Sequence, residues 1–189
     1  MSIKILGGLL KGHPIHFKES EGLRPTTVML RRKLFDAFQN LSGYSFVDLC
    51  AGSGAMGIEA WSRGANEVYL IEKNPKAKSA VKKTIQNLKE SFAEQIGQRP
   101  IFLECQDCLK FLKANELLKS SNSILFLDPP YHDESLYLSV FKLLEEESYV
   151  GTLWFEFDLK QLKGWKGLVR GRAHKVYKSS GRQIVVVEY

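Results

Sequence analysis

The sequence predicts an α/β fold in which helices cover both faces of a mostly parallel sheet. Short apolar runs alternate with longer amphipathic segments between residues 46 and 157. A glycine-rich turn follows the first apolar run, as expected where a strand passes into a helix. Two more apolar segments, at 168–177 and 183–188, predict a closing antiparallel hairpin. Repeated strand–helix–strand units of this kind imply a parallel sheet, here of seven strands with the hairpin included.

Length and composition favour a cytoplasmic protein with one main domain. The chain has 189 residues, of which 44% are hydrophobic, enough for one core with a small appendage. No apolar run approaches a membrane span, and the first residues lack the apolar segment of a signal peptide. Three cysteines fit reduced thiols better than a disulfide framework. We expect no membrane partner, an N-terminal β-hairpin extension over residues 1–27 and a main domain over residues 28–189.

The net charge of +6 is distributed unevenly along the chain. Residues 1–45 carry +4, residues 46–156 carry −4 and residues 157–189 carry +6. Basic flanks around an acidic middle are expected if the flanks hold a polyanion and the middle performs chemistry. Small cytoplasmic proteins are often basic as well, so charge alone leaves nucleic-acid binding open.

The first residues predict a small hairpin ahead of the main fold. Apolar and polar residues alternate over 3–17 around glycines, which is typical of two short strands. Further along, Pro25 holds Arg24 extended, and Thr26 or Thr27 can cap a following helix.

A helix is predicted over residues 28–41. Five apolar residues fall on one face at helical spacing, namely Leu30, Leu34, Phe35, Phe38 and Leu41. On the same pattern, Arg31, Arg32 and Lys33 are expected to lie toward solvent or a ligand.

A glycine turn at 51–57 joins a strand predicted over 46–50 to the next helix. Glycines let the backbone approach a ligand, and the helix N-terminus offers free N–H groups. The second strand, predicted over 68–71, ends at Glu72, whose carboxylate is placed to accept both hydroxyls of a ribose. An ordinary tight turn with an acidic strand end remains the alternative.

The alternation continues through the middle of the chain. Further strands are predicted over 101–104, 124–127 and 152–157, and helices over 75–92, from about 108 to 119, and over 135–147. Ligands of such sheets bind beyond the carboxyl ends of the strands. Asp48, Glu72, Asp107 and Asp128 fall at or just after the ends of the first four strands, and we expect them to converge on one crevice.

Asp128-Pro129-Pro130-Tyr131 follows the fourth strand directly. Two prolines fix two φ angles and remove two backbone donors, so the segment forms a rigid rim. The rim presents a carboxylate, free carbonyl oxygens and an aromatic face. These groups suit a planar ring that bears an amino group, because they offer both stacking and acceptors for its N–H bonds.

Cysteines and histidines give weaker signals. Cys105-x-x-Cys108 lies between a strand and a helix, where redox motifs also occur, but no second pair supplies metal ligands. The four histidines are too dispersed in sequence to suggest a metal site, so no metal is expected. Only His132, next to Tyr131, is placed to touch a phosphate or a base.

Two motifs carry a family resemblance. Asp48-x-x-Ala-Gly-Ser-Gly-x-x-Gly57 followed by Asp128-Pro-Pro-Tyr131 resembles the class I S-adenosylmethionine-dependent methyltransferases, which have a Rossmann-like fold. Four further motifs narrow the resemblance to the RsmD family: Ile5-Leu6-Gly7-Gly8, Leu23-Arg24-Pro25-Thr26-Thr27, Leu34-Phe35 and Ser62-Arg63-Gly64-Ala65. That family methylates N2 of one guanine in small-subunit (16S) ribosomal RNA.

The resemblance implies roles for particular residues. The 51–57 loop would cradle the methionine part of S-adenosylmethionine, Glu72 would hold the ribose, and Asp107 with Cys108 would border the adenine. The implied cofactor-binding residues are Asp48, Ala51, Gly52, Ser53, Gly54, Gly57, Glu72, Asp107, Cys108 and Arg31. The implied catalytic residues, which hold the target base, are Asp128, Pro129, Pro130 and Tyr131.

The resemblance also implies ribosomal RNA as the partner, within a partly assembled small subunit. The residues expected to contact RNA are Arg24, Thr26, Thr27, Arg32 and His132. The chain departs from the family at Val28-Met29 and at Arg32, where the family usually has Asp-Arg and Glu.

Three other functions fit parts of the pattern. A DNA adenine-N6 methyltransferase shares the Asp-Pro-Pro-Tyr motif, although this short chain has no obvious separate target-recognition domain. A protein-glutamine methyltransferase is expected to carry Asn at position 128. A non-catalytic RNA-binding assembly factor would keep the fold and the basic flanks but has no need of Glu72 and Asp128.

Overall fold

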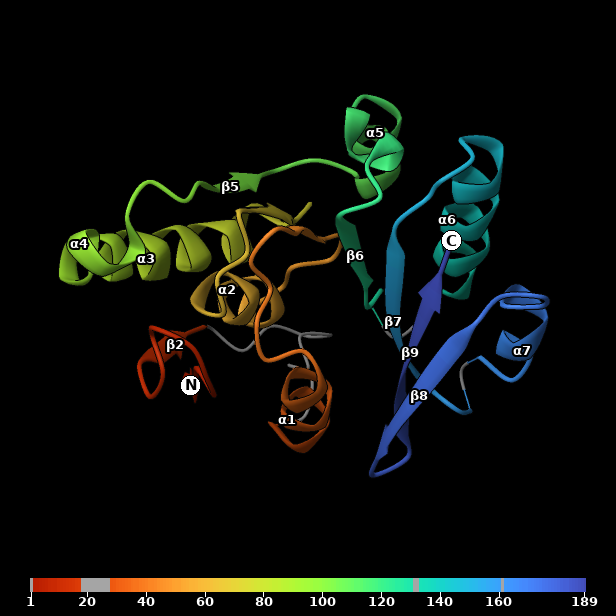
Figure 1. Cartoon of the computed structure of the whole chain (residues 1–189), viewed down its shortest axis with the longest axis horizontal. Coiled ribbons are helices and arrows are strands. Elements are labelled where there is room, and N and C mark those ends of the chain that lie inside the picture. Colours follow the sequence, from red (N-terminus) through yellow and green to blue (C-terminus); the bar gives the residue numbers. More distant parts are fainter. Residues whose placement is uncertain (1, 18–27, 131–132, 161) are drawn as a thin grey trace.

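A seven-stranded sheet forms the centre of the molecule (Figure 1). The computed structural model describes residues 2–17, 28–130, 133–160 and 162–189. The strand order is β5-β4-β3-β6-β7-β9-β8. The first five of these pair in parallel, and β9 pairs antiparallel with both β7 and β8. The strands are β3 (Ser45–Asp48), β4 (Glu67–Ile71), β5 (Ile101–Glu104), β6 (Ser123–Leu127), β7 (Thr152–Asp158), β8 (His174–Ser179) and β9 (Arg182–Glu188). The predicted fold class is confirmed.

Helices cover both faces of this sheet, as predicted (Figure 1). One buried cluster joins one face to α1, α2, α3 and α4, and a second joins the other face to α5, η1, α6 and α7. The helices are α1 (Val28–Ala37), α2 (Ala55–Ser62), α3 (Pro75–Ser91), α4 (Ala93–Ile96), α5 (Cys108–Lys113), the 3₁₀ helix η1 (Glu116–Lys119), α6 (Glu134–Glu146) and α7 (Trp165–Leu168). Among the described residues, no helix has the length and apolar character needed to cross a membrane.

The predicted N-terminal hairpin consists of β1 (Ser2–Lys4) and β2 (Pro14–His16). It packs against the end of α2, where the N–H of Leu10 donates to Ser62 Oγ at 2.8 Å. Leu10 and Ile15 are fully buried in the same cluster as α1, α2 and α3. The hairpin is therefore part of one continuous core.

Strand β6 is buried at all five positions, as expected for a central parallel strand. Beside it lies β3, and from this pair the chain order runs outward in both directions, through β4 to β5 on one side and through β7 on the other. The carboxyl ends of β3 and β6 therefore mark the topological switch point, where α/β sheets bind ligands.

Arg31 was predicted to lie toward solvent or a ligand, and that orientation is wrong. Its side chain is fully buried and does not line the crevice. The hairpin covers that side of α1, and Arg31 Nη2 donates to the carbonyl of Lys4. Burial lowers the pKa of Arg31, and the nearby Glu59 carboxylate raises it. Helical periodicity could not predict this burial, because the hairpin that covers Arg31 comes from another part of the chain.

Some element boundaries also differ from the prediction. α1 ends at Ala37 instead of residue 41. The helix predicted up to residue 119 is divided in two, because Asn115 breaks it and caps η1 by accepting a hydrogen bond from Leu117 N at 3.0 Å. The short helices α4 and α7 were not predicted, and α7 ends at the first residue of the segment predicted as the first hairpin strand.

Candidate active site

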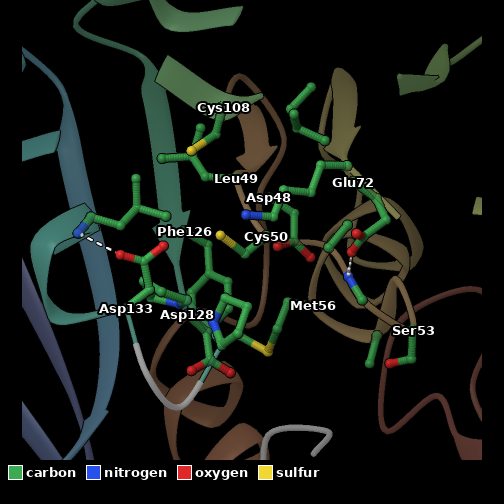
Figure 2. Close-up of a pocket in the computed structure, with 18 of the residues that line it drawn as sticks. Asp48, Leu49, Cys50, Ser53, Met56, Glu72, Cys108, Phe126, Asp128 and Asp133 are labelled. Carbon is green, nitrogen blue, oxygen red and sulfur yellow. Dashed lines mark hydrogen bonds between the residues drawn. The ribbon is translucent and has the colours of Figure 1, made fainter. Parts of the chain in front are cut away.

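A cavity opens at the topological switch point, and the four predicted carboxylates converge on it. Figure 2 shows Asp48, Glu72 and Asp128 in its wall. Asp48, Glu72, Asp107 and Asp128 all line this cavity, so their predicted convergence is confirmed. Other predicted site residues in its wall are Ala51, Gly52, Ser53, Cys108, Pro129 and Pro130. The glycine turn, the ends of β4 and β6 and the start of α5 therefore form one site.

Glu72 holds the glycine turn in place. Its carboxylate accepts from Gly52 N at 2.8 Å and from Asn74 N at 2.7 Å. The turn needs left-handed backbone at Gly52, with φ 51°, and at Gly54, with φ 74°. Glu72 also faces the cavity, so one side chain both shapes the loop and presents acceptors to a ligand (Figure 2).

Asp48 lies beneath the turn and is 1% exposed. Its Oδ2 accepts from Gly57 N at 3.3 Å, while Oδ1 makes no hydrogen bond of normal geometry within the described part of the chain. Burial and the nearby Glu72 raise the pKa of Asp48 to about 7, although the N–H of Gly57 opposes the shift. A buried oxygen without a partner, beside a cavity, is suited to a cationic ligand group.

Gly57 itself does not line the cavity. It allows close packing of α2 on β4, because a Cβ at this position would lie 2.1 Å from Leu70 Cδ2. Gly54 likewise lies behind the wall, at the N-cap of α2. These two predicted residues shape the site without bordering the cavity.

Asp107 and Cys108 follow β5 and lie at the start of α5. Asp107 caps α5 by accepting from Leu109 N at 3.0 Å and Lys110 N at 3.1 Å. The Cys108 thiol is hydrogen-bonded with Cys50, which raises the pKa of Cys50 and lowers the pKa of Cys108. Cys108 therefore pairs with Cys50 across the cavity wall, whereas the side chain of Cys105 contacts the carbonyl of Lys73.

Asp128 is part of an ion-paired network that sequence reasoning missed. Arg182 Nη2 lies 2.9 Å from Asp128 Oδ1, and Arg182 Nε lies 2.8 Å from Glu156 Oε1. Burial and then Glu156 raise the pKa of Asp128 well above its usual range, and Arg182 opposes this shift. The network arises from the antiparallel pairing of β7 with β9, which brings Arg182 opposite Asp158 and diagonal to Glu156.

Several further cavity residues were also missed. Asp133 caps α6 by accepting from Leu136 N at 3.2 Å, a pattern that its place before a helical segment could have revealed. Phe17 reaches the cavity from the end of the hairpin, and Met56 and Gln106 border it from α2 and the loop before α5. Only three-dimensional packing brings these three together.

The remaining predicted residues either lie away from the cavity wall or fall outside the described residues. Arg31 is buried under the hairpin, and Arg32 is exposed on α1 outside the cavity wall. The other predicted contacts lie outside the described residues: Arg24, Thr26, Thr27, Tyr131 and His132. Within the described ranges, no group of three or more His, Cys, Asp or Glu residues is arranged to hold a metal ion.

Comparison with known proteins places these features in a family. Residues 3–156 match the family model described as conserved hypothetical protein 95. The ribosomal RNA small subunit methyltransferase D of Buchnera aphidicola is 35% identical over 163 residues, which cover 84% of this chain and 80% of that protein.

Solved structures agree on the fold. Escherichia coli yhhF aligns with a TM-score of 0.75 at 22% identity, over 100% of this chain and 98% of that one. A T. thermophilus 16S rRNA N2 G1207 methyltransferase, solved with AdoMet and guanosine, aligns with a TM-score of 0.69 at 18% identity, over 100% of this chain and 49% of that one. Together with the family match and the sequence relative, these findings show that the chain belongs to the ribosomal RNA small subunit methyltransferase D family.

Proposed function

We infer that this protein transfers a methyl group from S-adenosylmethionine to the exocyclic N2 of a guanine in small-subunit ribosomal RNA. The observation that carries this proposal is the rigid Asp128-Pro129-Pro130 segment, which lines the same cavity as Asp48 and Glu72. The names of the sequence relatives support ribosomal RNA as the substrate. The fold neighbour that acts on guanine N2 supports the choice of base.

The cavity residues fit S-adenosylmethionine. The cofactor is cationic at its sulfonium and at its amino group, and the unpartnered Asp48 Oδ1 offers a buried acceptor for positive charge. Glu72 would accept the ribose hydroxyls, and the 51–57 turn would hold the methionine part. Asp107 and Cys108 would border the adenine. The bound cofactor supplies an electrophilic methyl group, so the protein needs no further activation of the donor.

The acceptor amine is the harder problem, since its lone pair is delocalised into the ring. Asp128 and the carbonyl of Pro129 would accept the two amine hydrogens and favour a pyramidal nitrogen with its lone pair directed at the methyl group. Asp128 would also stabilise positive charge as it develops on nitrogen. Alignment of the two reactants can supply roughly 7–11 kcal/mol, and the proton can leave after transfer. Tyr131 would stack on the base.

The target base must be unpaired or flipped to reach Asp128, and a single-stranded RNA loop lowers that cost. The basic flanks would hold the phosphate backbone, with Arg24, Thr26, Thr27, Arg32 and His132 as the proposed contacts. A partly assembled small subunit is the proposed substrate, which implies action in the cytoplasm.

Reconstitution with labelled cofactor tests this proposal. Purified protein is incubated with methyl-labelled S-adenosylmethionine and either naked small-subunit RNA or small subunits from cells that lack the gene. Digestion and mass analysis should place the label in N2-methylguanosine. Label in N6-methyladenosine or in protein glutamine would identify a different acceptor. No transfer to either substrate, together with calorimetry that shows no cofactor binding, would refute the proposed methyltransferase activity.

A further inference from the structure

We propose that Arg182, anchored by Glu156, is a positioning residue for methyl transfer: it fixes the Asp128 side chain and favours its carboxylate form. This inference rests on the proposed function. It concerns two residues from strands that were assigned no role in the site, β7 and β9.

The geometry shows a guanidinium fork shared between two carboxylates. Nη2 of Arg182 lies 2.9 Å from Asp128 Oδ1, and Nε of the same side chain lies 2.8 Å from Glu156 Oε1. The side chains of Arg182, Asp128 and Glu156 are 14%, 16% and 0% exposed. Because the guanidinium donates a hydrogen bond to Asp128 and forms an ion pair with Glu156, both carboxylates fix its position, and Asp128 is oriented through it.

Arg182 also reaches the cavity wall beside Asp128 and Pro129, although it comes from the opposite end of the chain. Arg182 Nη2 donates its hydrogen bond to Asp128 Oδ1. With one carboxylate oxygen committed to orientation, Oδ2 would accept a hydrogen of the acceptor amine.

The charges around Asp128 show why a counterion is needed. Glu156 on β7 and Asp48 at the end of β3 both raise the pKa of Asp128, and burial raises it further. The Tyr137 hydroxyl of α6 and the Cys50 thiol also lie within its electrostatic reach. Of these neighbours only Arg182 is cationic, and it is the group that lowers the pKa of Asp128. A protonated Asp128 could accept fewer amine hydrogens and would not stabilise positive charge on nitrogen.

The test is the pH profile of single-turnover methyl transfer in the full-length protein. Arg182→Gln should move the acid limb to higher pH by about one to three units, the range for removing an adjacent Arg from a carboxylate. Glu156→Gln should move the limb to lower pH, because it removes a like charge. Arg182→Lys keeps the charge, so its acid limb should lie close to that of the parent.

A matched control separates these effects from the loss of any arginine ion pair. Arg172→Gln breaks a pair with Glu145 at 3.1 Å on the outside of the molecule, and its profile should match the parent. If Arg182→Gln folds poorly, the double variant Arg182→Gln/Glu156→Gln preserves the local charge balance, and its limb should lie between those of the single variants.

Opposite shifts in the two single variants would support the positioning role, since a merely structural defect lowers activity at every pH. An acid limb that stays in place in active Arg182→Gln, or a double-variant limb that coincides with that of Glu156→Gln alone, would overturn it. The parent protein is measured first. Absence of methyl transfer there would refute the proposed function, whereas an unmoved limb in an active variant would refute only the role of Arg182.

Discussion

The carboxylates of the cavity differ in what surrounds them. Asp128 has a cationic partner in Arg182, and Glu72 accepts two backbone N–H groups. Asp48 accepts from the N–H of Gly57, and its pKa is raised to about 7. These environments suit different tasks, with Asp128 oriented by Arg182 for the proposed acceptor and Asp48 available to a cationic ligand group.

Replacing Asp128 by Asn should slow methyl transfer by about 10²–10³-fold, because it removes a charged acceptor from the point where positive charge develops. Cofactor affinity should change little, since Asp128 is proposed to hold the acceptor. Single-turnover kinetics and calorimetry measure the two effects separately. Asp36→Asn, at an exposed position of α1, serves as the control. A parent rate in Asp128→Asn would contradict the role assigned to this carboxylate.

Asp48 should make stability depend on pH. Its folded-state pKa of about 7 lies above the ordinary value of 3.8, so the native state retains a proton that the unfolded state releases. The free energy of unfolding therefore falls as pH rises from about 4 to about 7, by roughly 4 kcal/mol at about 1.4 kcal/mol per unit.

Asp48→Asn should remove this dependence. Urea unfolding at several pH values measures this. Relative to the parent, the free energy of unfolding of the variant should increase between pH 5 and 7, and the difference should be constant above pH 7. A difference that is the same at every pH would show that Asp48 is ionised throughout.

Sequence reasoning found the carboxylates of the site but missed their counterion. Strand ends can be located from local pattern, and parallel strands bring those ends together, so Asp48, Glu72 and Asp128 were predictable. Arg182 pairs with a residue 54 positions away, and that contact depends on the register of β9 on β7. The burial of Arg31 was missed for a similar reason, because the hairpin that covers it is remote in sequence from α1.

At the scale of elements, the passage from β3 through the glycine turn into α2 sets the shape of the site. Gly57 permits α2 to pack directly on Leu70 of β4. The sequence predicted this unit well, because strand, glycine turn and helix are contiguous. It predicted the helices after β5 less well, since Asn115 ends one helix and caps the next within a few residues.

Gly57→Ala should destabilise the fold by about 1–3 kcal/mol, because the new methyl group would lie 2.1 Å from Leu70 Cδ2 and force α2 away from the sheet. The matched control is Gly167→Ala, in the helix α7, where an added Cβ meets nothing within 4 Å. Urea denaturation measures both. Equal midpoints for the two variants would show that α2 can shift at no cost.

At the scale of the whole molecule, the N-terminal hairpin and the sheet domain share one hydrophobic core, and a buried cluster of charged residues also joins them. Glu59 is fully buried and accepts from Leu6 N at 2.7 Å and from Arg63 Nε at 2.9 Å. Arg31 lies close enough for Glu59 to raise its pKa. The sequence predicted a hairpin as a separate extension, and only the folded chain shows how closely it is joined to α1 and α2.

Glu59→Ala should therefore cost about 3–5 kcal/mol, because it leaves buried arginines without a counterion. Chemical denaturation with fluorescence detection measures this loss. Glu116→Ala, which removes an exposed i,i+3 pair with Lys119, should leave the midpoint where it is. Equal and small effects of both variants would mean that the hairpin is held by its apolar contacts alone.

The fold, the convergent carboxylates and the basic flanks combine into one claim, that this molecule methylates a guanine of small-subunit RNA. The most direct test is a mass map of that RNA from cells that lack the gene, complemented with the parent protein or with Asp128→Asn. One N2-methylguanine should be missing without the gene, return with the parent and stay absent with the variant. A map in which every guanine methylation is unchanged by the deletion would contradict the claim.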